Sequence, residues 1–358
     1  MQKITLSLGG MLLLLLAGCT TSPDGRLEPL LGGYYDGHYP LERIDPAYDL
    51  YFNAFLIADA DGNLLLTADR EPDPALAAHA GKQGKRALIS LGGTTPFGCF
   101  TGTEQEIDAY VAQVIDYVEK NGYDGVDVDW EHPNTEPLGK QWSATIKALR
   151  TALDELGRRN GRHYLLTTAL PPGDWSLKYN DFAVMRDCLD YVNVMCYDLG
   201  WGTSNYHAPR FANPADPARV SSVDQLTYLE NVVGMPRSKL IIGLPFYGNY
   251  FRDTERFVEV PDENWRQITY REALDYSEDW QREYEPESCG VWAFGPDRRE
   301  FVIYDSPQSI YDKTTYYLEN GYGGVFCWAM NRDLLADGSQ PLTQAMVQAR
   351  RDFLNRNE

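Results

Sequence analysis

Eight short apolar runs, rich in β-branched and aromatic residues, recur along this chain and constrain its fold more than any other feature. Longer stretches with a helical period separate them; in 104–120, for example, Ile107, Val111 and Val114 share one helical face. The runs lie at 31–35, 50–57, 86–91, 125–130, 164–170, 191–197, 240–245 and 324–330. Strands alternating with helices in this number predict an α/β fold, the (β/α)8 or TIM barrel. An open doubly wound sheet is disfavoured because no GxGxxG fingerprint follows the first run.

The connections between the runs differ in length, and the one after the seventh run is the longest. Within it, two apolar segments joined by Gly295-Pro296-Asp297 predict a β-hairpin. We therefore expect one domain over 29–358, with a small insertion at 250–305. Loops that follow barrel strands build the active face of this fold, so functional side chains are expected at the carboxyl ends of the strands.

The fourth run carries three acids at alternate positions, Asp127, Asp129 and Glu131. Side chains two apart on a strand share a face, so these carboxylates point together into the barrel while Val128 and Trp130 point outward. Crowding and burial raise the pKa of at least one of them, which then holds a proton near neutral pH, as a general acid requires. A solvated acidic edge strand and a calcium loop are the alternatives. Valines between the acids, without a turn glycine, fit a strand better than a calcium loop.

The excess of acidic over basic residues limits the classes of ligand that this chain is expected to bind. The chain has 52 acidic and 32 basic residues, a formal net charge of −20, and shows no cluster of lysine and arginine. A nucleic-acid partner is disfavoured because binding phosphates needs such a cluster, and attraction to anionic lipid is disfavoured for the same reason. Aromatic residues make up 13% of the chain. A neutral, ring-shaped ligand suits this composition best.

The amino terminus has the features of a targeting segment. Lys3 precedes an apolar run at 4–16 that is too short to span a membrane, and the tetrapeptide ending at Cys19 resembles a bacterial lipobox. We predict that 1–18 is a lipoprotein signal peptide, that Cys19 carries lipid, and that 19–28 holds this anchor and a tether. The expected location is the bacterial cell envelope, at the outer membrane or cell surface. Five further cysteines cannot all pair, and with no zinc-type Cys/His spacing we predict no metal.

The segment from Asp124 to Glu131 resembles the DGxDxDxE motif of glycoside hydrolase family 18, the chitinase family. Six other segments match in the family's order: Gly33-Tyr34-Tyr35, Asn53-Ala54-Phe55, Ser90-Leu91-Gly92-Gly93 (SxGG), Met195-Cys196-Tyr197-Asp198 (MxYD), Gly243-Leu244-Pro245-Phe246-Tyr247-Gly248 and Gly323-Gly324-Val325-Phe326-Cys327-Trp328. The resemblance covers residues 31–335. It implies a role for each matched side chain.

By that resemblance, Glu131 is the general acid and later the general base. Asp129 orients the acetamide of the substrate, Asp127 shares a proton with Asp129 and tunes it, and Tyr197 donates a hydrogen bond to the acetamide. Trp328 is the floor under the sugar that is cleaved. The other implied substrate-binding residues are Asp198, Met195, Tyr34, Ser90, Phe55, Gly92, Gly93 and Tyr247.

The family implies hydrolysis of β-1,4-linked N-acetylglucosamine (GlcNAc) polymers or oligomers with retention of configuration. The acetamide of the substrate acts as nucleophile, so no cofactor is expected. Alternatives are an endo-β-N-acetylglucosaminidase acting on N-glycans or peptidoglycan, and a GlcNAc-binding lectin-like protein. Two departures concern the flanks of the site: Thr94 and Asn249 stand where many chitinases have Trp and Arg. We expect a monomer.

Overall fold

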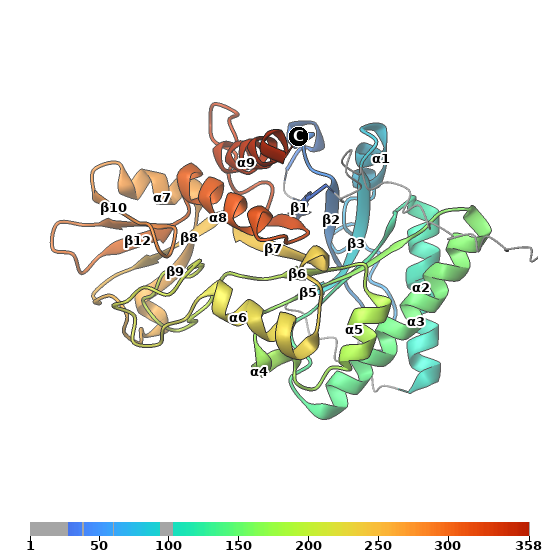
Figure 1. Cartoon of the computed structure of the whole chain (residues 1–358). Coiled ribbons are helices and arrows are strands. Elements are labelled where there is room, and N and C mark those ends of the chain that lie inside the picture. The colour runs from blue at the N-terminus through green and yellow to red at the C-terminus, as the bar shows by residue number, and fades with distance from the viewer. Residues whose placement is uncertain (1–27, 38, 60, 94–102, 358) are drawn as a thin grey trace, which may run out of the picture.

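The computed structural model describes residues 28–37, 39–59, 61–93 and 103–357. The predicted signal peptide, Cys19 and all but the last residue of the predicted tether lie outside these residues. Eight parallel strands close into a barrel in the order β1-β13-β7-β6-β5-β4-β3-β2 (Figure 1). They are β1 (Leu30–Tyr35), β2 (Leu50–Leu56), β3 (Arg86–Gly93), β4 (Gly125–Trp130), β5 (Leu165–Leu170), β6 (Tyr191–Val194), β7 (Leu240–Pro245) and β13 (Gly324–Trp328). The predicted TIM barrel is confirmed.

Helices connect the strands and cover the outside of the barrel (Figure 1). They are α1 (Ala75–Lys82), α2 (Glu104–Asn121), α3 (Glu136–Asn160), α4 (Asp174–Leu177), α5 (Phe182–Cys188), α6 (Ser222–Tyr228), α8 (Pro307–Glu319) and α9 (Pro341–Asn357). Capping residues in the sequence determine where α2 begins and ends. Thr103 and Glu106 form a reciprocal capping box at its start, and Gly122 adopts the left-handed conformation (φ +74°) at its end. Among the described residues, no helix is long and apolar enough to cross a membrane.

The insertion after the seventh barrel strand forms a second sheet beside the barrel (Figure 1). Its strands pair antiparallel in the order β10-β11-β12-β8-β9, and α7 (Tyr270–Ser277) packs on it. The strands are β8 (Tyr247–Phe251), β9 (Trp265–Thr269), β10 (Gln281–Glu285), β11 (Gly290–Phe294) and β12 (Phe301–Tyr304). The sheet has its own apolar cluster, which includes Trp292 and Phe301 and also Tyr206 from the loop after β6. That shared cluster ties the insertion to the barrel.

The barrel strands divide their side chains between two cores. Val126, Val128 and Trp130 of β4 belong to the large cluster that lies between the sheet and the helices. A smaller cluster inside the barrel contains Phe52 and Phe326. Strand alternation therefore leaves the inward positions of β4 to its acids.

The sixth strand ends earlier than the predicted run 191–197. The ladder stops at Val194, and the Cys196 amide then donates to the carbonyl of the same Val194 in a tight turn. Asp198 follows in the left-handed conformation, with φ of +54°. This turn takes Tyr197 and Asp198 out of the sheet and onto the active face.

Candidate active site

The three acids of the fourth strand are graded in exposure. Asp127 is fully buried, Asp129 is 3% exposed, and Glu131, directly after β4, has 24% of its side chain exposed. The ladder with β3 sets Asp127 beside Ser90 and Asp129 beside Gly92. Position along the strand therefore distinguishes the fully buried carboxylate of Asp127 from the partly exposed carboxylate of Glu131.

Asp127 is held by four donors from four other strands. Its Oδ2 accepts from the Tyr34 hydroxyl at 2.8 Å and the Ser90 hydroxyl at 2.7 Å. Its Oδ1 accepts from the Thr167 hydroxyl at 2.6 Å and the Asn193 amide at 3.2 Å. Burial raises the pKa of Asp127, and the four hydrogen bonds oppose that rise. The carboxylate is thereby fixed in position and has no lone pair free for a substrate.

Asp129 and Glu131 influence each other's protonation. Burial raises the pKa of Asp129 well above its ordinary value, and the negative charges of Glu131 and Asp127 raise it further. Burial also raises the pKa of Glu131; its hydrogen bond with Asp129 lowers that pKa, and the charge of Asp198 raises it. These raised pKa values favour a proton on the carboxyl groups of Asp129 and Glu131. The Glu131 side chain is the one of the two that reaches solvent. One oxygen of Asp129, Oδ1, is buried without a hydrogen-bond partner.

Tyr197, Asp198 and Tyr247 face one another across the active end of the barrel. The Tyr197 and Tyr247 rings meet edge to face at 6.1 Å. Burial raises the pKa of Asp198 to about 6, while the nearby Tyr247 hydroxyl and the positive charge of Arg332 act to lower it. Burial and the charges of Asp129, Glu131 and Asp198 raise the pKa of Tyr197 well above 10, so its hydroxyl keeps its proton.

An aromatic platform forms the floor. The Trp328 ring, at the end of β13, stacks on Phe55 with centroids 5.7 Å apart and planes at 21°. Tyr34 tilts against Trp328 at 5.5 Å. The Arg332 guanidinium lies 5.5 Å from the ring centroids of both Trp328 and Tyr247.

The described residues of the predicted site converge on one end of the barrel, because they stand at or just past the carboxyl ends of its strands. Gly92 and Gly93 pair with Asp129 and Trp130 at the end of β3, and Met195 packs in the inner cluster with Tyr34. Cys19 and Thr94 lie outside the described residues.

Several residues of the site were missed by sequence reasoning. Thr167 and Asn193 are polar positions inside apolar runs, and this alone was a signal that they face the acids. Gly243 makes room for Tyr197, since a Cβ at this position would lie 2.7 Å from the Tyr197 ring. Arg332 lies after the last strand and has no sequence signal that links it to the site.

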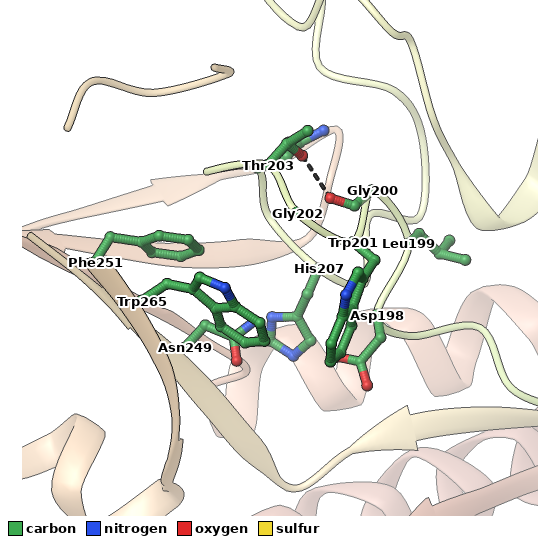
Figure 2. A pocket seen from close by; sticks show the side chains of 11 residues that line it. Asp198, Leu199, Gly200, Trp201, Gly202, Thr203, His207, Asn249, Phe251 and Trp265 are labelled. Atoms are coloured by element: carbon green, nitrogen blue, oxygen red, sulfur yellow. Dashed lines mark hydrogen bonds between the residues drawn. The ribbon is translucent and has the colours of Figure 1, made fainter. Parts of the chain in front are cut away.

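A hollow adjoins Asp198 between the loop after β6 and the insertion sheet (Figure 2). It is lined by Asp198, Leu199, Gly200, Trp201, Gly202, Thr203, Asn205, His207, Asn249, Phe251 and Trp265. No group of three or more His, Cys, Asp or Glu side chains that could hold a metal ion occurs in the part of the chain that the structure describes.

The family model "Glycosyl hydrolases family 18" matches residues 33–333. Chitinase 1 of Aphanocladium album is 25% identical over 68% of this chain and 60% of its own length. Endochitinase 1 of Metarhizium anisopliae is 27% identical over 72% of this chain and 63% of its own length. The chain thus spans less than two thirds of these curated relatives.

Solved structures share the fold. A family 18 N-acetylglucosaminidase from Paenibacillus barengoltzii has a TM-score of 0.78 at 23% identity, over 90% of this chain and 99% of that one. A chitinase-like agglutinin from Robinia pseudoacacia has a TM-score of 0.77, also at 23% identity, over 89% of this chain and 99% of that one. With a family match that covers most of its length, the chain belongs to glycosyl hydrolase family 18.

Proposed function

We propose that this protein is a glycosidase that cleaves β-1,4-linked GlcNAc chains, such as chito-oligosaccharides, with retention of configuration. The observation that carries the proposal is the graded exposure of the three acids. Asp127 is closed off by four donors, Asp129 is buried with one free oxygen, and Glu131 reaches solvent with a raised pKa.

Glu131 acts as the proton donor. A carboxyl group with a raised pKa holds its proton near neutral pH and gives it to the glycosidic oxygen as the bond to the anomeric carbon breaks. The same carboxylate then takes a proton from the water that completes hydrolysis. Asp129, through its hydrogen bond with Glu131, shares in holding the proton between these steps.

The nucleophile in this proposal is the acetamide oxygen of the substrate. Asp127 is an unsuitable nucleophile because its four hydrogen bonds occupy both oxygens. The unpartnered Oδ1 of Asp129 suits the role of acceptor for the acetamide N–H, which orients the carbonyl oxygen toward the anomeric carbon. The Tyr197 hydroxyl, which keeps its proton, suits the role of donor to the acetamide oxygen.

The platform of Trp328 and Phe55 provides an apolar face on which a pyranose ring stacks. Asp198, Met195 and Tyr247 bound the sugar from the other side. A substrate with no acetamide next to the cleaved bond therefore lacks its nucleophile and is not hydrolysed.

The test is a product profile with a matched variant. Chito-oligosaccharides, a high-mannose glycan and peptidoglycan are each incubated with the wild-type protein and with Glu131→Gln, which keeps the shape of the side chain but has no acidic proton. The proposal predicts cleavage of chito-oligosaccharides by the wild type, and sugar binding without turnover by the variant.

Two alternatives have outcomes of their own. Cleavage of the N-glycan or peptidoglycan alone identifies an endo-β-N-acetylglucosaminidase of another specificity. Binding without cleavage of any substrate by the wild type identifies a lectin-like protein. The fold shared with the Robinia agglutinin supports this alternative.

We also propose that the protein lies in the cell envelope and is a monomer. In this proposal, residues 1–18 are removed, Cys19 carries lipid, 19–28 is anchor and tether, and 29–358 is the catalytic domain. Support comes from β1, which begins at the barrel end opposite the acids, so an anchor entering there leaves the site open. Incorporation of labelled palmitate into the wild type but not into Cys19→Ser tests the anchor, and gel filtration of the protein without residues 1–19 tests the monomer.

A further inference from the structure

We propose that His132 positions the water that completes hydrolysis: its Nε2 accepts one hydrogen of that water while Glu131 takes the other. The inference rests on the proposed function and deepens it, since it assigns the choice between water and a second sugar as acceptor to a residue outside the matched motifs.

His132 follows the general acid in the chain and lies beside it in the structure. Its Nε2 is 3.9 Å from the Glu131 Oε2, which is too far for a direct hydrogen bond. If one water binds both atoms at ordinary distances, its two hydrogen bonds meet at an angle of about 90° at the water oxygen, which keeps both bonds close to linear. The side chains of His132 and Glu131 are 26% and 24% exposed, so solvent water reaches both.

The imidazole ring of His132 is fixed in place. It meets the Trp175 ring edge to face, with centroids 4.9 Å apart and planes at 76°. Trp175 lies in α4, after β5, so this contact joins the ends of two paired strands. The His132 carbonyl also accepts from the Asn134 amide at 2.8 Å, in a tight turn that holds the backbone. A ring held in this way loses little entropy when it binds a water.

His132 also has the charge state that this role requires. Burial lowers the pKa of His132, so its ring is neutral at pH 7, with one nitrogen that donates and one that accepts. Glu131 faces the ring from the end of β4, and α4 faces it with the uncharged indole of Trp175. Nδ1 is buried and has no hydrogen-bond partner among the described residues. The proton is assigned to Nδ1, because Nε2 faces a carboxyl group that holds a proton of its own.

The second half of the reaction shows how this contact selects water. The water oxygen attacks the anomeric carbon, and the bond from that carbon to the acetamide oxygen breaks and returns its electron pair to the acetamide. One hydrogen of the water passes as a proton to the Glu131 carboxylate, and the other stays in the new hydroxyl group, directed at the His132 Nε2. A sugar hydroxyl has only one hydrogen, which Glu131 takes, so it leaves Nε2 without a donor. His132 therefore favours water over a sugar as the acceptor.

The ratio of sugar transfer to hydrolysis tests this role. A GlcNAc pentamer is incubated with the protein at high concentration, and mass spectrometry quantifies the shorter products of hydrolysis and the longer products of transfer. His132→Phe keeps a ring against Trp175 and removes both nitrogens, whereas His132→Gln places an amide oxygen near the position of Nε2. His79→Phe is the matched control, since His79 lies in the outer helix α1 with its ring against Tyr51.

We expect His132→Phe to raise the ratio of transfer to hydrolysis about 3- to 10-fold, as the loss of one uncharged hydrogen bond to the water predicts. His132→Gln should bring the ratio back toward that of the wild type, and His79→Phe should match the wild type. A ratio that is unchanged in His132→Phe, or raised equally in His132→Gln or His79→Phe, would overturn the role of His132 alone. Failure of the wild type to cleave any GlcNAc oligomer would overturn the proposed function and this role with it.

Discussion

Replacing Asp198 with asparagine tests whether this residue of the proposed active site lowers the stability of the folded protein. Burial raises the pKa of Asp198 to about 6, although Tyr247 and Arg332 favour the charged form. Its backbone has a φ of +54°, a left-handed conformation that asparagine tolerates nearly as well as aspartate. Asp198→Asn therefore removes a buried negative charge without adding backbone strain.

The magnitude follows from the pKa. The difference between about 6 in the folded protein and the ordinary 3.8 corresponds to about 3 kcal/mol of unfavourable charge burial. Because the folded pKa is the higher one, the folded state binds the proton more tightly, and stability falls as pH rises from about 4 to about 6. Asp198→Asn should therefore raise the free energy of unfolding by at most about 3 kcal/mol at pH 8. The gain in stability should vanish at pH 4. The value at pH 8 is an upper limit, because the variant also loses the attraction between Asp198 and Arg332.

Urea unfolding followed by circular dichroism at pH 8 and pH 4 measures both values. Asp181→Asn is the control. Asp181 caps α5; burial raises its pKa, but the backbone hydrogen bonds from Val184 and Ala183 and the charge of Lys147 together outweigh burial, so that the pKa is lowered. That variant should gain nothing at pH 8. The reasoning is refuted if Asp198→Asn gains no stability at pH 8, or gains equally at both values.

Two further predictions concern buried polar contacts. Thr167→Val removes a donor to the buried Asp127 carboxylate and should cost about 2 kcal/mol of stability at pH 7, whereas Thr168→Val, which loses only a bond to a neutral carbonyl, should cost about 1 kcal/mol. Equal costs in urea unfolding would contradict the stronger hydrogen bond expected at the Asp127 carboxyl group. Lys313→Met breaks a fully buried ion pair with Asp305, whose oxygens lie 2.8 and 2.9 Å from the ammonium, and should cost about 3–5 kcal/mol. A thermal midpoint equal to that of the wild type would contradict this prediction.

Much of the barrel was predictable because each strand carries its own local signal. The runs at 125–130 and 240–245 coincide with β4 and β7, since a buried parallel strand is a short apolar run bounded by turns. The run at 191–197 overshot β6 by three residues. Its apolar composition continues past Val194, where the tight turn at Cys196 ends the ladder.

The arrangement around the acids was less predictable. The pairing of β8 with both β12 and β9 joins segments far apart in the chain, and no local pattern encodes such contacts. For the same reason the sequence did not link Arg332 or His207 to the site. The acids themselves were found because their spacing of two residues is a local property of one strand.

The anomeric form of the first product is the most direct test of the central claim. Proton NMR follows the hydrolysis of a chito-oligosaccharide from the first minutes, before the sugar mutarotates. An acetamide nucleophile, with Glu131 as acid and then base, predicts that the β-anomer appears first and that Glu131→Gln releases no product. Initial release of the α-anomer, or equal release by Glu131→Gln, would contradict the account.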